Sequence, residues 1–267
     1  MPSSSSNMTK AERREAAREQ ARQLREAQAK REKRNRNLII VGVIALVVVV
    51  GIALYAIISQ GTRSAIESVD NVPANSSVDD GGIPLGSELV AGTSNDGAPV
   101  LDVYLDFSCP HCGTFEEVNA EDINEVVSAG EATVVYHPVA ILDRTGNWSG
   151  FSGRAAQAAA VVADQAPEAY NDFQSALFEL IANATSAEPT DEEIAAAAVE
   201  AGVPQEVADT LTVPLEERPF TEWVQATTQQ FSRDGYSGTP TVMIDGDTIE
   251  PELWGQPGAL AEELRAS

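Results

Sequence analysis

The strongest hydrophobic pattern in the chain is an uninterrupted apolar run, Leu38–Ile58, which contains no charged side chain. As a helix with about 1.5 Å of rise per residue, a run of this length spans the roughly 30 Å core of a bilayer. The residues before it, Lys30–Arg36, are mostly basic, whereas Arg63 is the only cation that soon follows it. Because positive flanks stay in the cytoplasm, the pattern predicts a single-pass helix with a cytoplasmic N-terminus and an extracytoplasmic remainder. The alternative is a cleaved signal peptide, although both the basic flank and the apolar run are long for one.

The segments on either side of this run are polar. Residues 1–37 consist largely of Ala, Glu, Arg, Gln and Lys, which are strong helix formers but supply no apolar face. They predict an exposed basic helical segment in the cytoplasm, either a solvated flank or a contact for anionic lipid headgroups. Residues 59–81 are rich in Ser, Asn, Asp, Gly and Pro, which predicts a flexible linker. The rest of the chain, 82–267, is expected to form the folded domain.

The first part of this domain shows alternating strand and helix patterns. Ile83–Leu85 reads as a short edge strand, and Val100–Phe107 is a run of strand formers that indicates a buried strand. A helix over Cys109–Val127 and a strand over Ala132–His137 follow. Strand, helix and strand within about 40 residues form a βαβ unit, which predicts a parallel pair of strands.

The pattern then becomes helical, with an insertion expected over about 139–215. Thr190 and Glu193 have the spacing of a capping box. A turn, a strand at Thr241–Ile244, a tight hairpin with a short partner strand at Thr248–Glu250, and a closing helix at Gly258–Ala266 should complete the domain. The helices expected in and after the insertion are Phe151–Gln165, Pro167–Ala182, Thr190–Ala201 and Glu216–Arg233.

Charge is distributed unevenly along the chain. Residues 1–60 contain 11 of the 17 Lys and Arg but only 5 of the 41 Asp and Glu, so residues 61–267 carry a net charge of −30. A nucleic-acid-binding surface needs cationic groups to meet phosphate. The acidic domain therefore excludes nucleic acid as an expected partner.

The two cysteines of the chain, Cys109 and Cys112, flank Pro110 and His111 at the junction between the buried strand and the helix. A thiol at a helix N-terminus ionises readily, and a second thiol one turn away can resolve a mixed disulfide. His111 is near enough to give the first sulfur a hydrogen bond or positive charge. A structural disulfide across so short a loop would add little stability. A metal site using both cysteines and the two histidines, His111 and His137, is the other alternative.

Two motifs give the chain a family resemblance. One reads Asp-Phe-Ser-Cys-Pro-His-Cys over 106–112 and the other Gly-Thr-Pro-Thr-Val over 238–242, with the helical insertion between them. In this order the chain resembles a membrane-anchored member of the DsbA family of thiol:disulfide oxidoreductases. The resemblance implies an α/β thioredoxin-like fold with an all-helical insertion. It further implies that Cys109 is the nucleophile, Cys112 the resolving thiol and Pro240 a cis-proline, with the Thr239 backbone docking substrate.

One position departs from the family pattern. Many relatives carry a buried acidic residue six positions before the first cysteine, where it accepts the proton of the second thiol; this chain has Val103. Asp102 and Asp106 flank that position, but strand alternation places both on the face opposite Val103. The group that accepts the Cys112 proton is therefore left open.

The function expected from these residues is the introduction of disulfides into secreted or envelope proteins. A stabilised thiolate at Cys109 makes the disulfide form a good oxidant, and disulfides persist outside the cytoplasm. The only redox group expected is the Cys109–Cys112 disulfide, with no other cofactor and no metal. The resemblance implies reoxidation by a membrane quinone-linked partner of the DsbB or VKOR type. The alternatives are a thiol reductase or isomerase, or an envelope module that carries copper or zinc.

Overall fold

The computed structural model describes residues 10–61, 64–185 and 187–267. The chain divides into two compact units between Arg63 and Ser64. Residues 1–9 of the expected basic segment lie outside the described residues, as do residues 62–63 of the expected linker.

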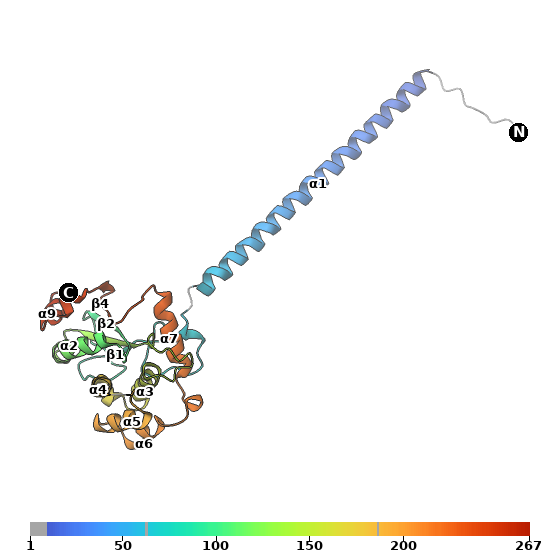
Figure 1. The fold of residues 1–267 in the computed structure, drawn as a ribbon. Helices are drawn as coiled ribbons and strands as arrows, with labels where there is room; N and C mark the ends of the chain where they lie inside the picture. The colour runs from blue at the N-terminus through green and yellow to red at the C-terminus, as the bar shows by residue number, and fades with distance from the viewer. Residues whose placement is uncertain (1–9, 62–63, 186) are drawn as a thin grey trace. The chain divides into compact units, whose positions relative to one another are not determined.

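The first unit contains one continuous helix, α1 (Lys10–Gly61) (Figure 1). The residue pattern predicts a basic helix and a separate membrane helix, but good helix formers join them without an intervening proline, so the helix does not break. Within α1, Ala21–Ala53 is long and apolar enough to cross a membrane, and it overlaps the expected span over 38–58.

The second unit is built around a five-stranded mixed sheet in the order β1-β3-β2-β4-β5. The parallel pair predicted from the βαβ pattern is confirmed, since β2 lies parallel to β3, while β1, β4 and β5 are each antiparallel to their neighbours. The expected strand over 100–107 ends two residues early, at Leu105. The strands are β1 (Ile83–Leu85), β2 (Val100–Leu105), β3 (Thr133–Pro138), β4 (Thr241–Ile244) and β5 (Asp247–Thr248).

Helices cover both faces of this sheet (Figure 1). Alternation along β2 sends Val103 into the main core, which it shares with Phe115 of α2 (Pro110–Ser128), and sends Tyr104 to the other face. There Tyr104 packs against Phe231 of α7 (Thr221–Arg233), with ring centroids 5.4 Å apart. The short α8 (Pro251–Trp254) and the closing α9 (Ala259–Ala266) pack against α2.

The insertion between β3 and β4 is helical, as predicted. The Thr190–Glu193 capping box is present at the start of α5. The helix expected from Glu216 begins instead at Thr221, because Pro219 lacks an N–H and restricts the residue before it. The helical elements between β3 and β4 are α3 (Phe151–Gln165), η2 (Pro167–Ala169), α4 (Tyr170–Ala182), α5 (Asp191–Glu200), α6 (Gln205–Thr210), η3 (Leu215–Glu217) and α7.

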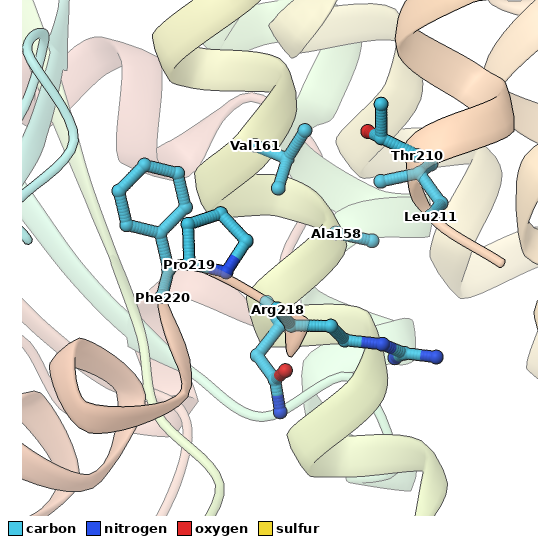
Figure 2. Close-up of a pocket in the computed structure, with 8 residues that line it drawn as sticks. Ala158, Val161, Thr210, Leu211, Arg218, Pro219 and Phe220 are labelled. Atoms are coloured by element: carbon cyan, nitrogen blue, oxygen red, sulfur yellow. The ribbon is translucent and has the colours of Figure 1, made fainter. Parts of the chain in front are cut away.

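The insertion packs closely against itself. Figure 2 shows Pro219 and Phe220 meeting α3 near Val161, with Leu211 on the opposite side. The cavity left among these residues is only about 10 Å³, close to the volume that one water needs. This close packing fixes the positions of α3 and α4, whose side chains lie beside the dithiol.

The segment that follows the first unit differs from the flexible linker expected over 59–81. From Ser64 onward it packs on the domain: Ile66 of η1 (Ile66–Ser68) is fully buried, and the Ala65 N–H donates to Gln230 Oε1 at 2.9 Å. Gly81 adopts a positive φ of 75°, and an added Cβ there would lie 2.3 Å from Thr227 Cγ2. A polar composition suggested flexibility, but these tertiary contacts hold the segment in place.

Candidate redox site

The two cysteines lie where β2 gives way to α2. Cys109 is the N-cap of α2 with extended backbone angles, and Pro110 occupies the first helical position, where its missing N–H costs nothing. Cys112 lies two residues later, inside the first turn. Cys109 keeps 7% of its surface exposed and Cys112 only 1%. One sulfur is therefore within reach of a partner, and the other is shielded behind it.

Asp106 builds the turn that holds this junction. Its carboxylate accepts hydrogen bonds from the Ser108 N–H at 2.8 Å, the Leu142 N–H at 2.9 Å and the Ser152 hydroxyl at 2.6 Å. Burial nevertheless raises the pKa of this carboxyl, and the nearby Cys109 adds to the rise. Asp106 thus ties the dithiol loop to α3 and to the chain after β3.

Strand alternation alone predicts that Asp106 lies on the face opposite Val103, and it does not predict this role of Asp106 in the turn. Because β2 ends at Leu105, the period of two does not reach Asp106. The available signal was the Asp-Phe-Ser pattern itself, since aspartate often accepts from the backbone N–H two residues later in a turn.

The Cys109 thiol is strongly acidified. Its pKa falls from an ordinary 9.0 to about 5, chiefly through the hydrogen bond from the Cys112 thiol and against the opposing effect of burial. The Thr239 side chain and the backbone N–H groups of Cys112 and His111 lower the pKa further. At neutral pH Cys109 is therefore a thiolate.

The Cys112 thiol behaves in the opposite way. Burial raises its pKa well above the ordinary value, and its hydrogen bond to Cys109 and the negative charge of that sulfur raise it further. The pair therefore holds one negative charge, on the outer sulfur, and one proton, on the inner sulfur. This is the charge distribution that a nucleophile and a resolving thiol require.

The loop before β4 closes over the dithiol. The Thr239–Pro240 peptide bond is cis, as the family resemblance predicted. In its protonated form Cys109 Sγ donates to the Thr239 carbonyl at 3.2 Å. Antiparallel pairing of Tyr104 with Thr241 brings this loop to the end of β2. Thr239 Oγ1 is buried and has no hydrogen-bond partner among the described residues, although the Thr239 side chain helps to lower the pKa of both thiols.

The two residues between the cysteines are exposed. Sequence analysis expected the His111 side chain to stabilise the Cys109 thiolate. Among the described residues, the backbone N–H of His111 lowers the pKa of the sulfur and the imidazole forms no hydrogen bond with it, so the role of the side chain stays a prediction.

The other candidate residues from the sequence, Val103, Asp102 and His137, do not contact the dithiol sulfurs through a hydrogen bond in the described residues. Val103 is fully buried, and Asp102 Oδ1 accepts a hydrogen bond from His137 Nε2 at 2.9 Å on the α7 face of the sheet. The His137 ring stacks on Tyr104 at 4.0 Å. Because His137 is engaged there, the four-ligand metal site considered from the sequence does not come together, and residues 10–61, 64–185 and 187–267 contain no cluster of three potential ligands.

Comparison with known proteins agrees with this geometry. A family model described as Thioredoxin matches residues 86–257, which is more than half of the chain. The chain belongs to this thioredoxin family. Part of the chain, 79 residues or 29% of it, is also 37% identical to the serine/threonine-protein kinase PknE of Mycobacterium tuberculosis, but it spans only 14% of that protein.

Solved structures show which kind of thioredoxin-family protein the chain resembles. The MdbA thiol-disulfide oxidoreductase of Actinomyces oris is 27% identical, with a TM-score of 0.65, over 78% of this chain and 98% of that one. MdbA of Corynebacterium diphtheriae is 26% identical with a TM-score of 0.57, over 75% and 98%. DsbA of M. tuberculosis is 27% identical with a TM-score of 0.52, over 69% and 98%. The DsbA-like resemblance is thus confirmed, and it supports an oxidoreductase.

Proposed function

We propose that this thioredoxin-family protein is a membrane-anchored oxidase that introduces disulfides into secreted or envelope proteins through Cys109 and Cys112. The observation that carries the proposal is the unequal ionisation of the two thiols, with the pKa of Cys109 at about 5 and that of Cys112 raised. Stabilising the thiolate of the reduced form makes the disulfide form easier to reduce. Such a disulfide is passed readily to other proteins.

The reaction follows from this asymmetry. A substrate thiolate attacks Cys109 Sγ of the oxidised protein, the Cys109–Cys112 bond breaks, and Cys112 leaves with the electron pair and takes up a proton in its buried site. A second substrate thiolate then attacks the substrate sulfur of the mixed disulfide, and the Cys109 thiolate departs. The substrate has lost two electrons and gained a disulfide, and the dithiol has gained both electrons. Since its pKa is about 5, Cys109 is a good leaving group at neutral pH.

The cis-proline loop would position the substrate for this attack. The Thr239 carbonyl lies 3.2 Å from Cys109 Sγ, in the loop that leads into the interior strand β4. An extended substrate segment would form backbone hydrogen bonds with this loop, beside the sulfur that it attacks. The reduced dithiol must next give up its two electrons, and we assign this step to a membrane quinone-linked reoxidase of the DsbB or VKOR type.

Activity of the purified full-length chain in a neutral detergent tests the proposal. The oxidised protein should form disulfides in a reduced, unfolded substrate, and Cys109→Ser should abolish this transfer. Equilibration with glutathione should give a potential nearer the roughly −120 mV of DsbA than the roughly −270 mV of thioredoxin. A thioredoxin-like potential would reject the oxidase in favour of a reductase.

The proposed location needs its own test. We propose that α1 anchors the chain with its N-terminus in the cytoplasm and the domain from Ser64 outside it. The candidate span within Ala21–Ala53 supports the anchor, and the basic residues Lys30–Arg36 before the apolar run support the orientation. A membrane-impermeant thiol reagent added to intact cells should label reduced Cys109. Labelling that occurs only after the cells are broken would place the domain on the cytoplasmic side.

A further inference from the structure

A groove opens beside the reactive sulfur, on a part of the surface that the proposed mechanism does not use. Its volume is about 740 Å³, and it runs between the first three turns of α2 and the last two turns of α4. Cys109 lies in its lining, whereas none of the described lining residues comes from the cis-proline loop. The groove is therefore a second surface on which a protein captured at Cys109 would rest.

The floor of this groove is apolar and fixed. Phe178 of α4 packs against Phe107 with ring centroids 5.0 Å apart, which anchors the floor to the strand that carries the dithiol. Glu116 is buried below, in a hydrogen bond with the Ser175 hydroxyl, and burial raises the pKa of its carboxyl. The apolar lining residues are Pro110, Ala120, Phe178, Ile181 and Ala182.

The rim is acidic. Glu117 and Glu121 of α2 and Glu179 of α4 are exposed and line the groove. A second hollow of about 450 Å³ adjoins the first, because Ser175 and Glu179 line both. It adds the carboxylates of Asp172 and Glu200. Every charged residue in the described lining of the two hollows is acidic.

The domain supplies few cations of its own to neutralise this rim. Residues 64–267 contain five arginines and no lysine. Arg154 and Arg218 are both committed to Asp191, and Arg265 to Glu125 and Glu131. No ion pair among the described residues involves a groove carboxylate, so the rim stays open to cations from a partner.

We infer that this groove selects its substrates: it binds an extended polypeptide segment in which lysine or arginine alternates with apolar side chains next to the reactive cysteine. The inference rests on the proposed oxidase function. Apolar side chains would cover the Phe178 floor, and the cationic ones would reach Glu117, Glu121 and Glu179. Charges arranged in this way favour productive encounter and fix the register of the segment. Polypeptides with acidic residues at the same positions are rejected by like charge.

The test compares two-cysteine peptides of one length that carry Lys, Gln or Glu beside the first cysteine. Oxidised full-length protein in a neutral detergent is mixed with each peptide at low ionic strength, and disulfide transfer is followed by quenching and mass spectrometry. Neighbouring charges also alter the peptide thiol itself, so each rate is divided by the rate of the same peptide with a small neutral disulfide. We expect the corrected Lys/Glu ratio to be about tenfold, which is the range for a few exposed ion pairs.

A matched pair of variants separates the groove from the overall negative field. Glu117→Gln/Glu121→Gln/Glu179→Gln should lower the corrected Lys/Glu ratio at least threefold. Glu206→Gln/Glu262→Gln/Glu263→Gln removes the same charge from exposed sites outside the groove and should leave the ratio unchanged. Equal ratios for the two triple variants, or no preference in the parent protein, would overturn the inference while leaving the oxidase intact. Failure to oxidise any peptide would instead refute the oxidase, and the groove inference with it.

Discussion

Replacing Cys112 with alanine should remove the contact that contributes most to the low pKa of Cys109. A hydrogen bond to a charged group is worth about 1.5–3 kcal/mol, and about 1.4 kcal/mol corresponds to one pH unit. The loss of the Cys112 donor should therefore raise the pKa of Cys109 from about 5 by about one to two pH units. Serine keeps a hydroxyl donor at this position, so Cys112→Ser should raise the pKa less than Cys112→Ala does.

Each variant leaves Cys109 as the sole cysteine, which makes the measurement direct. The ultraviolet absorbance of the thiolate is followed while the full-length protein is acidified, and the rate of alkylation across the same range provides a second readout. The order of pKa values should be Cys112→Ala above Cys112→Ser above the reduced parent. If the alanine variant titrates with the parent, the Cys112 thiol does not stabilise the Cys109 anion. A parent pKa near 9 would refute the whole account of the site.

The same ionisation makes the stability of the reduced protein depend on pH. The folded pKa of Cys109 lies below its unfolded value of 9.0, so its contribution is complete above that value and is lost as the pH falls through about 5. At neutral pH the upper limit is roughly 3 kcal/mol, and about half of this remains once solvent screening at the mouth of the site is allowed for. The oxidised protein lacks this thiolate, so the difference in urea stability between the two forms should change as the pH falls and become constant below about pH 5.

Three further predictions concern the supports of the site. Asp106→Asn turns one acceptor oxygen into an NH₂ group that faces an N–H or hydroxyl donor, so it should lower the free energy of unfolding by about 1–3 kcal/mol; an unchanged urea midpoint would contradict the network. Glu116 has a raised folded pKa, so stability should decline as the pH rises above about 4.5, and Glu116→Gln, which keeps an acceptor for Ser175, should flatten that decline and gain roughly 1 kcal/mol at neutral pH. A parallel pH dependence in both proteins would refute this reasoning. Thr190→Ala removes one half of the α5 capping box and should cost about 1 kcal/mol, whereas Thr212→Ala, at an exposed turn outside the helices, should cost less in the same denaturation assay.

Local signals in the sequence were enough to predict several features of the structure. The long apolar run, the βαβ pattern around Cys109 and Cys112, and the capping box at Thr190 each depend on neighbouring residues, and the structure has all three. The family resemblance, carried by two short motifs, supplied the cis bond before Pro240 as well. These features were predictable because hydrogen bonding and side-chain periodicity within a few residues determine them.

The remaining features depend on residues that are far apart in the chain. Sequence alternation could not show that Asp106 turns inward to meet Leu142 and Ser152, or that Ser64–Gly81 packs on the domain. The groove exists only because α4 lies beside α2, some 60 residues earlier, and the acidity of Cys109 arises from Cys112 held in a buried position. Burial and the approach of distant groups set both the desolvation and the hydrogen bonds of these side chains. The sequence by itself thus determined which chemistry is present, and the tertiary structure decided which thiol ionises and what surface a partner meets there.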